Sequence, residues 1–174
     1  MANVVSHTKP GKLIVADAGP LIALAIAEVL PQTIALYKTL LVPASVVDEC
    51  TADPTAPGAK VLAKLLRSRG IKIINEGDIT PLDAAYAQGL GSGEVAVLAY
   101  AAQHQHIALI DERRARRIAH RLQVPVVGSG AVLLALKASG SIPSVKPALE
   151  AWAAHGYFVA ATVLDEIIRR AGEG

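Results

Sequence analysis

Five short apolar runs recur along the chain, and none alternates polar with apolar residues. Such runs are typical of strands that are buried on both faces, as in a parallel sheet. Helical patterns rich in alanine and leucine lie between them. This alternation predicts an α/β fold with a central, mostly parallel five-stranded sheet and helices on both faces. The apolar runs are residues 13–16, 40–42, 71–74, 107–110 and 124–127, and the helical patterns are residues 21–30, 59–69, 93–105, 112–122 and 131–139.

Length and composition favour one domain with a full core. The chain has 174 residues, of which 52% are hydrophobic and 18% charged, and this balance excludes intrinsic disorder. Residues 51–58 are rich in proline and glycine and predict a surface loop, while residues 146–171 predict two helices with a break near His155 and Gly156. We therefore expect a single domain over residues 1–174, with a core of about residues 12–140 and a helical extension of about residues 141–172.

Several classes of protein are excluded by rare residues. Aromatic residues make up only 3% of the chain, so bases cannot be bound on a row of stacked rings as in many single-strand binders. The one cysteine, Cys50, excludes a disulfide framework and a cysteine-based zinc site, and we expect it to be a buried small hydrophobe. The net charge of +2 is too even to indicate a nucleic-acid partner by itself.

No apolar run approaches the roughly 18 residues that a membrane span requires. The segment from Met1 to Lys12 is polar and lacks the features of a secretion signal. We therefore expect a cytoplasmic protein that does not associate with a membrane.

Two aspartates directly follow predicted strands. Asp17 ends the first run and Asp111 ends the fourth. Ligands of open parallel sheets bind outside the carboxyl ends of the strands, and an acid at such a position is costly unless it is solvated, paired or bound to a cation. Each aspartate could instead cap the helix that follows it, and capping does not exclude metal binding.

Two glutamates lie in helical settings that could bring them to the same edge. Glu94 follows Gly91-Ser92-Gly93 at the start of a helical pattern, where negative charge stabilises a helix. Glu49 lies in the helix after the second strand. Its neighbour Asp48 points about 100° away, so at most one of the two is expected to face a site. A solvated surface acid is the alternative for Glu49.

A cluster of carboxylates is an all-oxygen site that suits Mg²⁺ or Mn²⁺ rather than Zn²⁺. Such ions support hydrolysis at phosphorus. The chain has no P-loop motif, and its Gly89-x-Gly91-x-Gly93 lacks the dinucleotide-binding spacing. A receiver-type signalling domain needs a lysine after a late strand, where this chain has Gly128-Ser129-Gly130.

One helix carries a basic face next to Asp111. Its basic residues fall within an arc of roughly 160°, opposite an apolar side. A solvated helix face is the ordinary interpretation, but five arginines without a lysine favour phosphate contacts. The basic residues are Arg113, Arg114, Arg116, Arg117, His120 and Arg121, of which Arg113, Arg114 and Arg117 are the predicted phosphate contacts.

Two other groups of side chains point less clearly to chemistry. His104 and His106 flank the start of the fourth strand, opposite Asp111, and are expected at the surface rather than as ligands. Trp152, Tyr157 and Phe158 cluster in the extension, where they could anchor it to the domain or contact a second chain.

In the order of its motifs, the chain resembles the PIN-domain family, which includes the ribonuclease toxins of VapBC toxin–antitoxin pairs. It is most similar to prokaryotic PIN-like nucleic-acid-binding proteins. The resemblance covers about residues 12–170, nearly the whole chain. It rests on residues 15–24 (VADAGPLIAL), on Val42-Pro43 through Val46 to Glu49, and on residues 91–96 (GSGEVA), 109–116 (LIDERRAR) and 126–134 (VVGSGAVLL).

The resemblance implies a three-layer α/β/α fold and metal-dependent endonucleolytic cleavage of RNA. By position, Asp17, Glu49, Glu94 and Asp111 would be the catalytic, metal-binding acids, with Mg²⁺ or Mn²⁺ as cofactor. Frequent homodimers and, for the toxins, a cognate antitoxin are also implied.

Two positions depart from the pattern of many family toxins. Gly19 stands where they have Ser, Thr or Asn, and arginines stand where they have a second Asp after Asp111. The alternative function is therefore a catalytically weak or inactive PIN-like module that binds nucleic acid or protein.

Overall fold

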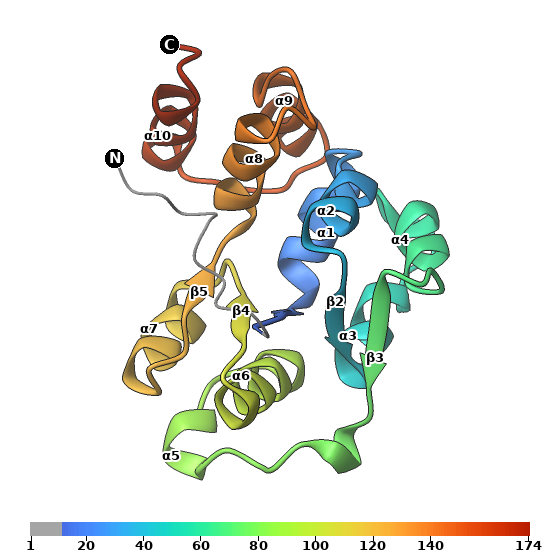
Figure 1. Cartoon of the computed structure of the whole chain (residues 1–174), viewed down its shortest axis with the longest axis vertical. Coiled ribbons are helices and arrows are strands. Elements are labelled where there is room, and N and C mark those ends of the chain that lie inside the picture. Colours follow the sequence, from blue (N-terminus) through green and yellow to red (C-terminus); the bar gives the residue numbers. More distant parts are fainter. Residues whose placement is uncertain (1–11) are drawn as a thin grey trace.

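A computed structural model describes residues 12–174 and contains a five-stranded sheet at its centre (Figure 1). The strand order is β3-β2-β1-β4-β5, and every pair of neighbours is parallel. The α/β fold class and the five strands predicted from the sequence are thus confirmed, and the sheet is entirely parallel. The strands are β1 (Ile14–Ala16), β2 (Leu40–Pro43), β3 (Ile71–Ile74), β4 (Ile107–Leu109) and β5 (Val126–Val127).

Helices make up the two outer layers. Crossovers between parallel strands are right-handed, so the direction in which the chain moves across the sheet decides on which face the connecting helix lies. From β1 through β2 to β3 the chain moves one way and places α1 to α4 on one face; it then moves the other way and places α5 to α7 on the opposite face (Figure 1). The helices are α1 (Ala18–Ile26), α2 (Leu30–Tyr37), α3 (Ala44–Thr51), α4 (Ala59–Leu65), the 3₁₀ turn η1 (Glu76–Asp78), α5 (Ala84–Ala87), α6 (Ser92–His104), α7 (Arg113–Arg121), α8 (Ser129–Ala138), α9 (Lys146–Ala154) and α10 (Ala161–Ala171).

Two helical features differ from the prediction. The pattern at residues 21–30 is two helices rather than one, because the chain turns at Glu28, whose φ of 58° lies in the left-handed region. Pro31 then lies in the first turn of α2, where a missing N–H is tolerated. The short helix α5 was not predicted.

Trp152 anchors the C-terminal extension to the core. Its side chain is 1% exposed, and its Nε1 donates a hydrogen bond of 2.8 Å to the carbonyl of Ala23 in α1. Helix α9 of the extension contacts α1, and α8, which precedes the extension, contacts α1 and α2. The start of the extension therefore covers the same face as the first helices (Figure 1). The anchoring interpretation of this aromatic cluster is confirmed for Trp152.

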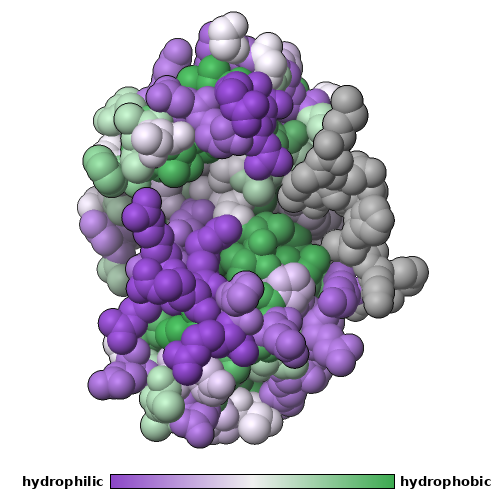
Figure 2. Space-filling view, turned by 90° about the vertical axis from the view of Figure 1, so that its left-hand side faces the viewer, coloured by the Kyte–Doolittle hydropathy of each residue, from purple (hydrophilic) through white to green (hydrophobic). Residues whose placement is uncertain are grey.

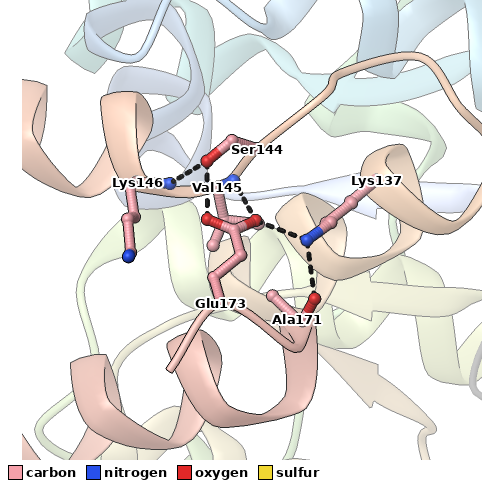
Figure 3. Close-up of polar contacts among 6 residues, drawn as sticks. All are labelled: Lys137, Ser144, Val145, Lys146, Ala171 and Glu173. Atoms are coloured by element: carbon pink, nitrogen blue, oxygen red, sulfur yellow. Dashed lines mark hydrogen bonds and ion pairs between the residues drawn. The ribbon is translucent and has the colours of Figure 1, made fainter.

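Glu173 fastens the end of the extension, as Figure 3 shows. Its carboxylate accepts hydrogen bonds from the Ser144 hydroxyl (2.5 Å) and the Val145 N–H (2.9 Å), and it pairs with Lys137 Nζ at 2.6 Å. Lys137 also donates to the carbonyl of Ala171. The Lys137 and Ser144 hydrogen bonds lower the pKa of Glu173 from 4.5 to about 2.

We expect Glu173→Gln to loosen α10 without unfolding the core. The lowered pKa means that the ionised carboxylate is stabilised in the fold, so its contribution is complete above the ordinary pKa of 4.5 and is lost as the pH falls toward about 2. Hydrogen exchange of α10 amides at pH 7 should accelerate in the variant. Exchange at the wild-type rate would contradict this role.

Across residues 12–174, no single helix is long and apolar enough to cross a bilayer. The helices α1 and α2 together reach that length and composition, but they are bent by 120° relative to each other. The prediction that Met1 to Lys12 is not a secretion signal concerns a segment of which residues 1–11 lie outside the described part of the chain.

Candidate active site

The sheet brings the ends of β1 and β4 together. These neighbours form the point where the chain order reverses, since α1 leaves β1 toward one face and α7 leaves β4 toward the other. The N–H of Asp17 donates to the carbonyl of Leu109 across this point, at 3.0 Å. Sheets of this kind bind ligands in the crevice at such a switch point. Asp17 and Asp111 therefore follow adjacent strands at the same edge of the sheet.

Asp17 is buried at this edge with an oxygen that lacks a partner. Its side chain is 7% exposed, and Oδ1 has no hydrogen-bond partner among the described residues. Asp17 takes the N-cap position of α1 but makes no side-chain capping bond, so the capping alternative is wrong for it. Burial raises its pKa from 3.8 to about 7; the backbone N–H of Ala18 lowers it, and the charges of Glu94, Glu49 and Asp111 raise it further.

Gly93 lies between Asp17 and Glu49. A β-carbon at this glycine would lie 3.3 Å from Asp17 Oδ1 and 3.3 Å from Glu49 Oε2, so both carboxylates border one small space. Glu94, the next residue, accepts a hydrogen bond from the Gly91 N–H at 2.8 Å and thereby fixes the start of α6. Asp48 is exposed and is not among the charges that raise the pKa of Asp17.

Cys50 lies beside this space as an apolar side chain. It is 5% exposed, and burial raises its pKa to about 12, with the charges of Glu49 and Asp17 adding to the effect. The thiol therefore stays neutral, as expected for a buried small hydrophobe.

Asp111 is held by α8 and by the extension. Its Oδ1 accepts from the Ser129 N–H (2.8 Å) at the start of α8, and its Oδ2 accepts from the Tyr157 hydroxyl (2.7 Å). The alternative that Asp111 caps α7 is wrong, because Glu112 caps that helix through the Ala115 N–H. Burial and the adjacent Asp111 carboxylate raise the pKa of Tyr157, which keeps the hydroxyl a donor.

The arginines of α7 divide into a structural group, which contacts other residues, and a group that we call free because it makes no hydrogen bond or ion pair within residues 12–174. Arg114 donates to the Gln88 carbonyl (2.8 Å), Arg116 donates to the Ile110 carbonyl (2.9 Å), and Arg121 lies 5.0 Å from the ring centre of Tyr86. Arg113 lines a cavity together with Asp111, and Arg117 is exposed. Figure 2 faces the side of the molecule that carries α7 and α10, and strongly hydrophilic side chains gather where α7 lies.

The carboxylates suit a divalent cation, although they do not converge on one point. No group of three His, Cys, Asp or Glu side chains in residues 12–174 is close enough to hold a metal ion as the side chains stand. However, the partnerless buried Oδ1 of Asp17 and the space that it shares with Glu49 are a hard-oxygen arrangement suited to Mg²⁺ or Mn²⁺. Each hydrogen-bonded carboxylate also retains further lone pairs.

Tyr157 and Arg116 are the site neighbours that sequence reasoning did not assign. Tyr157 reaches Asp111 from 46 positions away, and Arg116 binds the carbonyl of the residue before Asp111. Gly128 permits this crowding, because a β-carbon there would lie 2.8 Å from Asp111 Oδ1. The rings of His104 and His106 stack on each other near the start of β4, and both lie tilted against the ring of Tyr100.

One of three comparisons with known proteins identifies a family. A family model described as a PIN domain matches residues 13–173. A search of curated proteins and a search of solved structures each find no match. The three-layer fold, the acids at the reversal point of the sheet and a match along almost the whole chain lead to one conclusion: the chain belongs to the PIN-domain family.

Proposed function

We propose that this chain is a Mg²⁺- or Mn²⁺-dependent endoribonuclease that hydrolyses phosphodiester bonds in RNA. PIN domains are generally nucleases and typically use divalent metal ions. The observation that carries the proposal is the buried Asp17, whose partnerless oxygen shares a space with Glu49 among four acids. Neighbouring carboxylates disfavour one another's ionised form, and a bound cation would relieve this repulsion.

Each acid has a distinct proposed role. Asp17 and Glu49 would hold the cation directly. Glu94 in the first turn of α6 and Asp111 just after β4 would add negative charge around it. When bound, the divalent ion would supply the positive charge and the activated water that phosphodiester hydrolysis requires. Burial of Asp17 keeps bulk water from solvating its carboxylate.

The free arginines of α7 would hold the flanking phosphates. Arg113 borders Asp111, and Arg117 lies one helical turn further along the same face. The sequence-based assignment also included Arg114, whose guanidinium already binds the Gln88 carbonyl. We therefore propose Arg113 and Arg117 as phosphate contacts and give Arg114 a structural role.

The experiment incubates the purified chain with a labelled single-stranded RNA in Mg²⁺, Mn²⁺ or EDTA. Internal cleavage in either metal and none in EDTA is the expected result. The matched pair Glu49→Gln and Asp48→Asn separates the two neighbouring acids: the first should lose cleavage and the second should keep it. Equal losses, or cleavage that persists in EDTA, would overturn the proposal.

A PIN-like module that binds RNA without cutting it is the second candidate. It is favoured by the hydrogen bonds that engage both oxygens of Asp111 and by Gly19, which offers Asp17 no side-chain partner. RNA binding by a wild type that does not cleave with either metal would select this function.

Finer expectations follow from the resemblance to toxins. We propose a cytoplasmic homodimer that pairs with an antitoxin encoded alongside it. Sedimentation velocity of the purified chain tests the dimer, and loss of growth inhibition on co-expression of the neighbouring small gene tests the antitoxin.

Tyr157→Phe should weaken the site while the fold persists. It removes the hydroxyl that orients Asp111 Oδ2, and partners behind metal ligands typically contribute about 10- to 100-fold to metal affinity or activity. We expect the Mn²⁺ concentration for half-maximal cleavage to rise by about 10-fold or more. Tyr100→Phe, at a tyrosine that packs against His104 near the start of β4 and thus at the end of the strand opposite Asp111, is the control. An unchanged metal requirement would show that the hydroxyl is dispensable.

Arg113→Ala and Arg117→Ala should weaken RNA binding for every sequence alike. Each lost phosphate contact should reduce the slope of log affinity against log salt by about 0.7 to 0.9. Arg114→Ala should leave that slope unchanged but lower the melting temperature, because its guanidinium fastens the loop after α5. Fluorescence anisotropy over a salt series checks the slopes. A slope change confined to Arg114→Ala would reverse the assignment.

A further inference from the structure

The extension carries one highly exposed aromatic ring beside the candidate active site. Phe158, between α9 and α10, is 91% exposed, while the other exposed large hydrophobic side chains reach 46% at most. Single exposed hydrophobic residues are common in proteins and need no explanation. Phe158, however, borders a cavity that reaches Asp111.

This cavity has both polar and apolar lining residues. Its volume is about 490 Å³, which lies in the range of cavities that hold small ligands. Asp111, Arg113 and Ser129 supply the polar lining, and Phe158, Val159 and Val163 supply apolar lining. The molecular surface is hollowed between α7 and the extension in Figure 2.

A nucleotide has the same division between charge and planar apolar surface. Its phosphate suits the Arg113 guanidinium, and its base suits an exposed aromatic face, since every base can stack. We propose that this cavity binds one base of a single-stranded RNA substrate on the ring of Phe158, next to the phosphate at Asp111. The inference rests on the proposed function, because it takes Asp111 as part of the cleavage site.

Neighbouring contacts hold the Phe158 backbone in place. Tyr157 donates to Asp111 at 2.7 Å, and its ring centre lies 5.4 Å from that of the buried Trp152. Trp152 in turn donates to the carbonyl of Ala23 in α1. Because Tyr157 ties this part of the chain to Asp111, the distance between the Phe158 backbone and the acid is set by the fold, and only the ring has to become ordered on binding.

The charges favour RNA over a protein as occupant. Asp111 and Arg113 both line the cavity that Phe158 borders, so a strand that places its phosphate beside Arg113 can bring its neighbouring base over Phe158. Aromatic residues are only 3% of the chain, so a single ring accommodates one base rather than a row of bases.

The test measures binding of a fluorescent single-stranded RNA in EDTA, where cleavage is prevented. Phe158→Leu keeps an apolar side chain but removes the ring, and affinity should fall by about 5- to 100-fold. Phe158→Trp should keep the affinity, because it restores a stacking face. Ile73→Ala, at an exposed apolar residue of β3, is the matched control and should bind like the wild type.

A series of RNAs, each with an abasic site at a different position, identifies the stacked base directly. The RNA that lacks the stacked base should bind the wild type as weakly as the intact RNA binds Phe158→Leu. Combining that RNA with the variant should weaken binding no further. Unchanged binding by Phe158→Leu would overturn the inference. Wild-type affinity in the leucine variant combined with loss of binding to a protein partner would assign the surface to that partner, and a dimer that dissociates only in Phe158→Leu would assign it to a second copy.

Cleavage assays with Mg²⁺ and Mn²⁺ separate this inference from the proposed function. Binding that depends on Phe158 in a protein that never cuts would refute the nuclease and retain the base site. Metal-dependent cleavage by a Phe158→Leu variant with wild-type KM would retain the nuclease and refute the base site.

Discussion

Asp17→Asn is expected to abolish RNA cleavage and, in the same sample, to stabilise the metal-free protein. Cleavage should fall by about 10³-fold, because loss of a metal ligand removes several kcal/mol of transition-state stabilisation. Stability should rise because the fold buries this carboxylate with an oxygen that lacks a partner, among other negative charges. A neutral amide of the same shape avoids the cost of that buried charge.

The stabilisation should depend on pH. The pKa of Asp17 is about 7 in the fold instead of 3.8, so between these values the folded chain holds a proton that the unfolded chain releases. Stability of the wild type in EDTA should therefore fall as the pH rises from about 4 to about 7, and then level off. At pH 8 the variant should be more stable by about 2–4 kcal/mol, a rise in melting temperature of about 5–10 °C.

Calorimetry at pH 5 and pH 8 measures both effects. The gain in melting temperature should shrink at pH 5, where wild-type Asp17 already carries its proton. Asp48→Asn is the control, because Asp48 is exposed. A variant that is less stable than the wild type at pH 8 would show that the Asp17 carboxylate supports the fold instead of straining it.

Gly93→Ala should remove activity and leave the fold intact. The added methyl group would lie 3.3 Å from oxygens of both Asp17 and Glu49, in the space that the cation is proposed to use. Alanine is a better helix former than glycine by up to about 1 kcal/mol, which offsets the tight contact of 3.1 Å with Val46. Cleavage should fall by about 100-fold, since small displacements in an active site have effects of this size.

Gly19→Ala provides the matched comparison. Gly19 is the second residue of α1 as Gly93 is of α6, but a β-carbon there meets nothing within 4 Å. This variant should cleave RNA like the wild type and melt slightly higher, because no tight contact offsets the helix preference of alanine. Full activity in Gly93→Ala, with melting unchanged, would place the reaction away from the space between Asp17 and Glu49.

The two aspartates at strand ends were the candidate site residues that could be inferred most directly from the sequence. Asp17 and Asp111 each follow a buried apolar run, and a parallel sheet necessarily brings such ends to one edge. Glu49 depended on the family resemblance, since its helix exposes both Asp48 and Glu49 to solvent. The approach of Gly93 distinguishes Glu49 from its neighbour, as does the effect of the Glu49 charge on the pKa of Asp17. The Gly93 contact joins α3 to α6 across a long separation in sequence.

Side-chain partners in α7 and the extension could not be inferred. The spacing correctly predicted an apolar side of α7, where Ala115, Ile118 and Ala119 are buried. It could not show that Arg114 binds the Gln88 carbonyl. That carbonyl lies at the end of α5, a helix of only four residues with no clear periodic signal in the sequence. Tyr157 meets Asp111 only because the chain returns over the sheet edge between α9 and α10.

The central claim is that a divalent cation held by these carboxylates makes the chain an RNA-cleaving enzyme. The most direct measurement titrates Mn²⁺ into one preparation while recording both bound Mn²⁺ and the rate of RNA cleavage. The account predicts that the two curves rise together and that Asp17→Asn abolishes both. Cleavage that reaches its full rate without bound Mn²⁺, or Mn²⁺ binding that survives in Asp17→Asn at wild-type affinity, would contradict it.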